Sequence, residues 1–124
     1  MADEATVTAA LKFEKAGVGA FELGKALQRI DVAGSRCVMH TQVISTTPTD
    51  EALDLGELAS AGLAYFENLS TTAGQNIHLH IGDGGTDFMK LLPGEAFVVR
   101  LASTDVWAIA AAGTPSLRYG VLET

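Results

Sequence analysis

Two histidines separated by a single residue are the feature of this sequence that most resembles a metal site. His78 and His80 lie in the segment NIHLHIGD, where apolar and polar residues alternate. Residues i and i+2 of a strand project to the same face, so the two imidazoles could share one transition-metal ion. Two ligands are too few, and the sequence offers His40, Asp83 or Asp87 as a third without singling out one of them. We predict no metal site and keep His78, His80 and His40 as the alternative metal set.

The glycine-rich loop after these histidines, GDGGTD, carries two acidic residues. Calcium loops of the EF-hand type need regularly spaced acids and a closing Glu, and this loop lacks that register. Asp-Gly and Gly-Gly instead supply the positive φ angles of tight hairpins. The loop therefore predicts a β-hairpin turn.

The sequence motifs of nucleotide binding and nucleophilic catalysis are missing. Neither GxGxxG, GxxxxGK[ST] nor GxSxG occurs in the sequence, and the histidines have no obvious Asp or Glu to orient them. The single cysteine, Cys37, excludes an internal disulfide and a thiolate cluster for zinc, and we expect it to be a small buried hydrophobe. These observations predict a protein that is not an enzyme and that uses no cofactor.

Composition narrows the class of partner. A net charge of -7, with 8 basic against 15 acidic residues, argues against binding to nucleic acid. Hydrophobic residues reach 48% and charged residues only 19%, which favours apolar surface buried between subunits. The longest apolar run, near Val106–Ala112, is too short for a membrane span, and the acidic N-terminus does not fit a secretory signal. We expect a soluble homo-oligomer without a nucleic-acid or membrane partner.

Short strands separated by turn residues account for most of the chain. Alternation over residues 7–13 predicts a first strand, and Gly17 and Gly19 predict the turn after it. Residues 20–32 fit either a short helix or strand pieces, and we favour strand. Pro93-Gly94 predicts another tight turn. Further strands are expected within residues 36–46, 63–69, 76–83, 88–92, 95–101, 105–111 and 116–123.

About seven to nine short antiparallel strands, without a convincing amphipathic helix, predict an all-β fold. We expect a single domain over residues 1–124, built as a β-sandwich or jelly roll, because a chain of this size supports one core. Trp107 alternates with Ile109, which predicts that both lie on a packed apolar face. Tyr65 is likewise expected in a core or an interface.

The chain from Thr46 to the C-terminus carries a series of strand and turn motifs. The run EALDLGELASAG precedes an aromatic-Asn strand, YFENLS, and a strand with a Gly/Asp turn follows. Then come the turn in LLPGEAFVVRLA and the closing pair VWAIAAAGTPSLRYGVLE. In this series the chain resembles small structural proteins of tailed bacteriophages. The resemblance implies a β-sandwich virion component without enzymatic activity, such as a capsid decoration (cement) protein or a small tail or fibre protein. The matched positions are turns, so no functional residue is carried over.

Our main hypothesis is a structural virion assembly protein, foremost a capsid decoration protein that binds and stabilises the capsid lattice. It would be made in the host cytoplasm, form a homo-oligomer with a trimer favoured, and bind the major capsid protein or another virion protein. We expect loops 46–51, 70–76 and 82–87 to contact neighbouring proteins or face outwards.

Two alternatives belong to other functional classes. A cupin-like metal-binding enzyme would use His78 and His80 with His40. Metal-binding cupins, however, place a Glu shortly after the His-x-His and a further His on a later strand, whereas here glycines occupy positions 84 and 85 and no later histidine exists. A carbohydrate-binding sandwich would need an exposed Trp107 or Tyr65.

Overall fold

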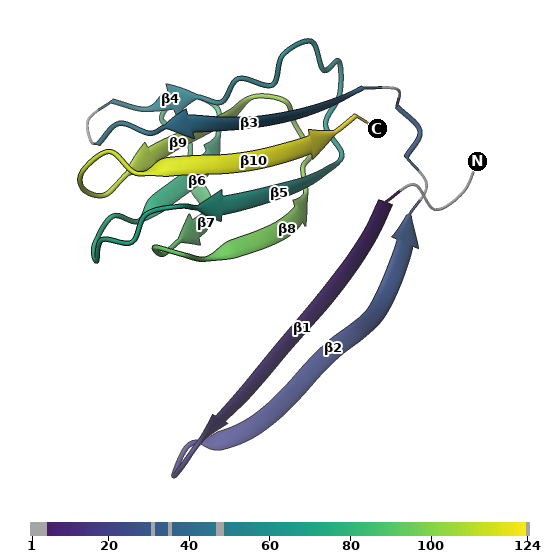
Figure 1. Ribbon diagram of the computed structural model, residues 1–124, viewed down its shortest axis with the longest axis vertical. Coiled ribbons are helices and arrows are strands. Elements are labelled where there is room, and N and C mark those ends of the chain that lie inside the picture. The colour runs from purple at the N-terminus through teal and green to yellow at the C-terminus, as the bar shows by residue number, and fades with distance from the viewer. Residues whose placement is uncertain (1–4, 31, 35, 47–48, 124) are drawn as a thin grey trace. The chain divides into compact units, whose positions relative to one another are not determined.

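The computed structural model describes residues 5–30, 32–34, 36–46 and 49–123. Within these ranges all regular structure is β-strand (Figure 1). The predicted all-β class is confirmed, and within the described ranges no helix could cross a membrane. The strands are β1 (Ala5–Lys15), β2 (Gly19–Ile30), β3 (Cys37–Val43), β4 (Glu51–Ala52), β5 (Leu63–Asn68), β6 (Ile77–Ile81), β7 (Asp87–Leu91), β8 (Ala96–Arg100), β9 (Val106–Ala110) and β10 (Ser116–Leu122).

The chain divides into two compact units, Met1–Ala33 and Gly34–Thr124. In the first, β1 and β2 pair only with each other, and we call this strand pair the ribbon. The other strands form two four-stranded antiparallel sheets, which together we call the sandwich. The first two strands satisfy their hydrogen bonds with each other and join neither sheet, and the single domain over residues 1–124 stays a prediction.

The sandwich stacks one sheet on the other. The strand order is β3-β10-β5-β8 in one sheet, here the β3 sheet, and β4-β9-β6-β7 in the other, here the β4 sheet. In Figure 1, β3, β10 and β5 lie in front of β9 and β6. Alternate residues of both sheets point into a shared core, as expected for such sandwiches. Its fully buried members include Ile44, Phe66, Ile77, Leu79, Leu91, Leu117, Tyr119 and Val121.

Strand β9 alternates as predicted. Val106, Ala108 and Ala110 are buried, while Trp107 and Ile109 are half-buried on the outer face of the β4 sheet. Small inward alanines leave room for the larger side chains of the facing sheet. Trp107 and Ile109 therefore share one face, as expected, but that face is not the core, and packing in an interface stays a prediction.

Two of the turns predicted from glycine are confirmed in the sandwich. The segment after β6 returns the chain into β7, as the GDGGTD loop predicted, and Gly82 and Gly84 there have positive φ angles of 81° and 69°. At Pro93-Gly94, the amide of Glu95 donates to the carbonyl oxygen of Leu92 at 3.0 Å. This second turn carries the chain from β7 in one sheet to β8 in the other.

The ribbon confirms strand over helix for the ambiguous segment that begins near residue 20. β1 and β2 have 11 and 12 residues and pair in antiparallel register from Ala5 opposite Ile30 to Lys15 opposite Gly19. The register shifts between Val7 and Ala9. Positive φ angles in the glycines of the connecting turn allow the reversal.

Candidate functional site

A buried histidine held between two carboxylates is the most concentrated group of titratable side chains in the sandwich. His80 is 2% exposed. Its Nε2 lies 2.8 Å from Oδ2 of Asp50, and its Nδ1 lies 3.2 Å from Oδ1 of Asp87. The other oxygen of Asp87 lies 3.0 Å from Nδ1 of His78. The Asp87 carboxylate thus bridges the two histidines.

Strand alternation and hairpin register place these groups. Ile77 and Leu79 of β6 point into the core, so His78 and His80 lie on the outer face of the β4 sheet. The β6–β7 register sets His80 opposite Asp87, with an irregularity beside it that adjusts the spacing. The hairpin that the glycine-rich loop closes therefore delivers the bridging carboxylate.

Asp50 joins this group from a distant part of the chain, just before β4. Its Oδ2 accepts hydrogen bonds from the His80 ring and, at 2.9 Å, from the amide of Gly84. One carboxylate therefore ties the segment before β4 to β6 and to the glycine-rich loop. We call Asp50, His78, His80 and Asp87 the histidine cluster.

The hydrogen-bond partners of His80 determine which chemical roles this cluster can take. Each ring nitrogen of His80 lies within hydrogen-bonding distance of one carboxylate oxygen. A buried polar side chain is tolerated when its hydrogen-bonding atoms are paired in this way. Because both ring nitrogens are occupied, neither offers a lone pair to a metal or to a substrate proton. The arrangement suits a structural clamp.

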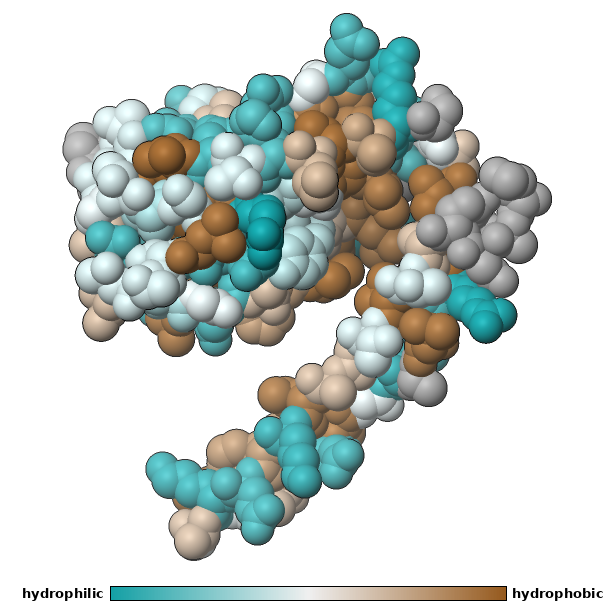
Figure 2. Space-filling view, viewed as in Figure 1, coloured by the Kyte–Doolittle hydropathy of each residue, from teal (hydrophilic) through white to brown (hydrophobic). Residues whose placement is uncertain are grey.

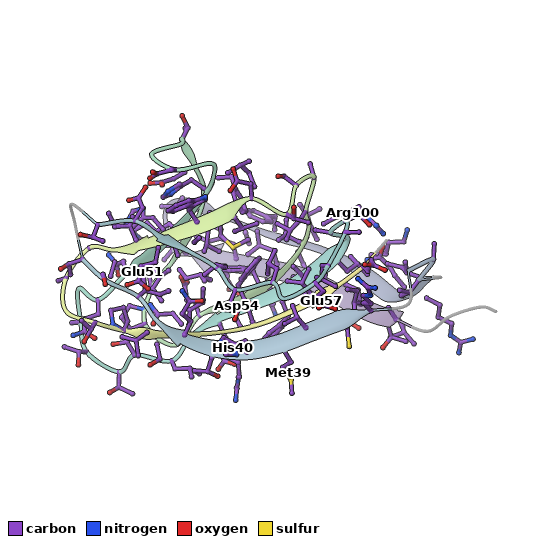
Figure 3. The ribbon with its side chains drawn as sticks, turned by 90° about the horizontal axis from the view of Figure 1, so that it is seen from above. Met39, His40, Glu51, Asp54, Glu57 and Arg100 are labelled. Atoms are coloured by element: carbon purple, nitrogen blue, oxygen red, sulfur yellow. The ribbon has the colours of Figure 1, made fainter. Side chains whose placement is uncertain are left out.

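The structure assembles only part of the alternative metal set. His78 and His80 meet at Asp87, but His40 lies on β3, in the other sheet, with its ring centroid 6.0 Å from that of Tyr119. Figure 3 labels His40 on this strand. Asp83, another possible third ligand, is exposed in the glycine-rich loop. Within the part of the chain that the structure describes, no three or more His, Cys, Asp or Glu side chains are arranged to hold a metal.

The sequence shows no obvious acidic partner for the histidines, and the structure supplies two, Asp50 and Asp87. Asp87 could have been found by closing the predicted hairpin, since the turn brings it back beside His80. Asp50 could not, because it is 30 residues away and nothing in its local sequence marks the contact.

A second polar group lies where β3 and β10 meet the segment after β4. The Tyr119 hydroxyl donates to the carbonyl oxygen of Asp54 at 2.7 Å and lies 3.1 Å from Oε1 of Gln42. Burial, followed by the nearby Asp54 carboxylate, raises the pKa of Tyr119 to about 12. Gln42 also donates to the carbonyl oxygen of Ala52 at 3.0 Å. A neutral phenol with these partners fastens the two sheets together along this edge, where Figure 3 labels Asp54 and Glu51.

Exposed polar side chains form a third group on the outer face of the β3 sheet. Arg118 donates to Oε1 of Glu67 through Nη2 at 2.6 Å, and the Tyr65 hydroxyl donates to the same oxygen at 2.8 Å. The hydrogen bond from Arg118 lowers the pKa of Glu67, and the bond to Glu67 raises the pKa of Tyr65. These contacts stay on one face and converge on no cavity.

The two aromatic residues of the carbohydrate-binding alternative do not form one platform. Tyr65 is exposed on the outer face of the β3 sheet, whereas Trp107 is on the outer face of the β4 sheet. The Trp107 indole donates to Oδ1 of Asp105 at 2.7 Å. Stacking on a sugar would therefore have to use either ring alone.

Three smaller expectations can be compared with the structure. Cys37 is exposed on the edge strand β3, so the prediction of a buried thiol is wrong. In loop 46–51, Asp50 turns towards His80 instead of outwards, and residues 47–48 lie outside the described ranges. In loop 70–76, residues 71–74 are exposed as expected.

No protein-family model matches this chain, and no curated protein matches it either.

Proposed function

We propose that this chain is a structural assembly protein of a tailed-bacteriophage virion, and that it serves as a capsid decoration protein which stabilises the capsid lattice. The observation that carries the proposal is the ribbon, whose two strands of 11 and 12 residues carry Leu11 and Leu23 at 59% and 66% exposure. Such surface marks a protein interaction site, because soluble proteins seldom leave it uncovered. The partners would be further copies of this chain and the major capsid protein.

The histidine cluster supports a structural role for the sandwich. Its carboxylates and imidazoles satisfy one another, and its most buried member has no free ring nitrogen. A general base or a metal ligand needs a lone pair directed at its target. The cluster instead joins three separate segments of the chain on one face of the β4 sheet.

The resemblance to phage structural proteins agrees with the division of the chain. The resembling segment, from Thr46 onward, lies wholly within the unit Gly34–Thr124. Its LLPGE turn is the connection that takes the chain from one sheet to the other. A tail or fibre protein could use the same folded unit, so the fold does not distinguish the capsid from the tail. The resemblance alone favours the capsid.

Native mass spectrometry of the purified full chain, without added metal, tests this function. This measurement reports subunit number and bound ions together. We expect a metal-free trimer or another closed ring. A monomer or dimer that carries one transition-metal ion per chain would overturn the proposal and favour the metalloenzyme. His80→Ala serves as the control, since it should leave the subunit number unchanged if the cluster is only structural.

A further inference from the structure

Strand β3 is an edge of its sheet. It stands first in the order β3-β10-β5-β8, so only one of its sides pairs with another strand. The amide of Ile44 donates to the carbonyl oxygen of Pro115 at one end of the β3–β10 ladder. Hydrogen-bonded pairs alternate along an antiparallel ladder, so the even-numbered residues of β3 turn their backbone groups towards β10. The backbone groups that point away from the sheet belong to Cys37, Met39, Thr41 and Val43.

These outward amides and carbonyls have no hydrogen-bond partner among the residues that the structure describes. The segment after β4 contacts β3 through the side chain of Gln42, which donates to the carbonyl oxygen of Ala52 at 3.0 Å. It forms no ladder with β3 in the described ranges. A row of unpaired backbone groups is satisfied by another extended strand. The edge of β3 is therefore a binding surface for a strand.

The other sheet edges are protected against pairing, whereas the β3 edge is not. β4 has only two residues. β7 begins with Asp87, carries Lys90 and follows a register shift in its hairpin, and β8 has five residues and ends at Arg100. Short strands, charges and bulges are the means by which proteins keep edges apart. β3 has seven residues in unbroken register with β10, without a charged residue or a proline.

The outer face of the same sheet is a weaker candidate for contact. Figure 2 looks onto this face, where apolar residues lie apart, separated by pale and hydrophilic ones. Arg118 and Glu67 form an ion pair there at 2.6 Å. A contiguous apolar patch is what marks a face as an interaction site. The backbone edge of β3 is therefore the stronger candidate on this sheet.

We propose that the β3 edge pairs antiparallel with the β3 edge of a second copy, across a two-fold axis at His40. Cys37 then lies opposite Val43 of the other copy. Met39 likewise lies opposite Thr41, and each outward amide meets an outward carbonyl. The inference rests on the proposed assembly function and assigns one of its contacts between copies. Because the same patch serves on both sides, the contact closes after two copies and can link copies of different rings.

Charge at the ends of β3 identifies a second copy as the occupant. At its start, Nη1 of Arg36 donates to the carbonyl oxygen of Glu57 at 2.7 Å. At its other end, Oε2 of Glu51 lies 3.4 Å from Nε2 of Gln42. Figure 3 labels Glu51 and Glu57 near opposite ends of this strand. Antiparallel pairing places the start of one β3 beside the end of the other, so Arg36 of each copy faces Glu51 of the other copy.

The remaining acidic side chains beside the edge are Asp54 and Glu57. Oδ1 of Asp54 accepts a hydrogen bond from the amide of Gly56 at 2.9 Å, within its own chain. Both residues are exposed, and salt at physiological strength screens such charges beyond about 8 Å. Backbone hydrogen bonds therefore supply the affinity of the contact, and the two pairs of Arg36 with Glu51 favour its register.

A distance measurement on the original chain tests the pairing directly. Cys37 is the only cysteine and is exposed, so a nitroxide label can be attached without a substitution. Pairing about His40 separates the two labelled Cα atoms by about 21 Å, which double electron–electron resonance should report after allowance for the label arms. The neighbouring registers give about 15 or 27 Å. Either of those values would overturn the inference, as would the absence of a distance, which is expected if the chain's own ribbon occupies the edge.

Proline on the two edges of the β3 sheet provides matched variants. Thr41→Pro removes an outward amide of β3, and Val98→Pro makes the same change at the free edge of β8. Neither amide pairs within its own sheet, so the two variants carry the same backbone constraint. In sedimentation velocity, Thr41→Pro should raise the dissociation constant of the contact at least tenfold, and Val98→Pro should leave it within about twofold.

Equal association of the two proline variants would overturn the inference. Urea midpoints followed by Trp107 fluorescence show that both variants are folded, and the distance in the original chain tests the contact without any variant. Failure of these tests leaves the proposed function intact. A metal-bound monomer of the original chain in native mass spectrometry would instead overturn the function itself.

Discussion

The ribbon and the sandwich are built from strands with similar alternation, yet they differ in what covers the apolar face. In the sandwich, Phe66 and Leu79 are fully buried between two sheets. In the ribbon, Leu11 and Leu23 alternate just as regularly but remain largely exposed. Burying a side chain of this size stabilises a fold by about 1.5 to 3 kcal/mol. Alternation therefore determines which face is apolar, and a second layer determines whether that face stabilises the molecule.

The two units also differ in the sequence distance of their contacts. Each ribbon pair joins residues on either side of one short turn. The sandwich instead pairs β10 with β3 and β5, strands that lie far apart in the sequence. Substitutions in the sandwich should therefore affect cooperative unfolding, while those in the ribbon should affect association.

Replacement of a phenylalanine by alanine should show this contrast most strongly. Phe66→Ala removes a fully buried ring and should lower the free energy of unfolding by about 3 to 5 kcal/mol. Phe21→Ala, in the ribbon, should lower it by less than about 1 kcal/mol. Urea unfolding followed by Trp107 fluorescence gives both values. Equal losses would show that the ribbon and sandwich unfold as one cooperative unit.

The histidine cluster should contribute the next largest effect. His80→Ala leaves Asp50 and Asp87 without their shared partner and should destabilise the sandwich by about 2 to 3 kcal/mol. His78→Ala is the matched control, because His78 is more exposed and contacts only one carboxylate; its loss should be smaller. Urea midpoints of the two variants measure both losses. A larger loss in His78→Ala than in His80→Ala would contradict the structural role of His80.

Alkaline pH should weaken the sandwich through Tyr119. Its pKa is raised to about 12 in the folded chain, above its ordinary value, so the neutral phenol is the form that folding favours. The resulting stability is complete below the unfolded pKa and is lost as pH rises from about 10 towards 12, by up to about 2 kcal/mol. Unfolding measured across this range for the original chain and for Tyr119→Phe checks the prediction. The phenylalanine variant should lack this part of the loss.

A pair of glycines provides the smallest test of the comparison. Gly94 and Gly17 have similar positive φ angles, 81° and 78°, and a Cβ at either position would meet nothing within 4 Å. Only backbone strain therefore distinguishes alanine from glycine at these sites. Gly94→Ala should lower the stability of the sandwich by about 1 kcal/mol, whereas Gly17→Ala should leave its urea midpoint unchanged. A shifted midpoint in Gly17→Ala would link the ribbon turn to the sandwich.

Local patterns in the sequence predicted most strands and turns of this fold. The alternation over residues 7–13 and the glycines after it predicted β1 and its turn, and Pro93-Gly94 predicted the turn before β8. These features depend on neighbouring residues alone, as strand period and turn chemistry do. That β1 and β2 pair apart from the other strands was not predicted, because alternation does not show which strands join a larger sheet.

The contacts of the candidate site were harder to predict because they depend on strand order. Asp87 follows His80 through a recognisable hairpin, but Asp50 reaches the same imidazole from before β4. The sequence left Trp107 in either a core or an interface, since Val106 and the alanines of β9 are apolar as well and composition alone does not decide which set points inwards. Exposure of Cys37 follows from the edge position of β3, which no local signal reveals.

The central place of β10 in the β3 sheet has a consequence for the order in which the chain folds during synthesis. β3 and β5 are both made before β10, yet β10 lies between them and pairs with each. On the ribosome, β3 therefore stays unpaired and separate from β5 until β10, near the end of the chain, has emerged. The ribbon needs only its own short turn and can form much earlier, because closing a small loop costs little entropy. A nascent chain would thus complete the ribbon before it completes the β3 sheet.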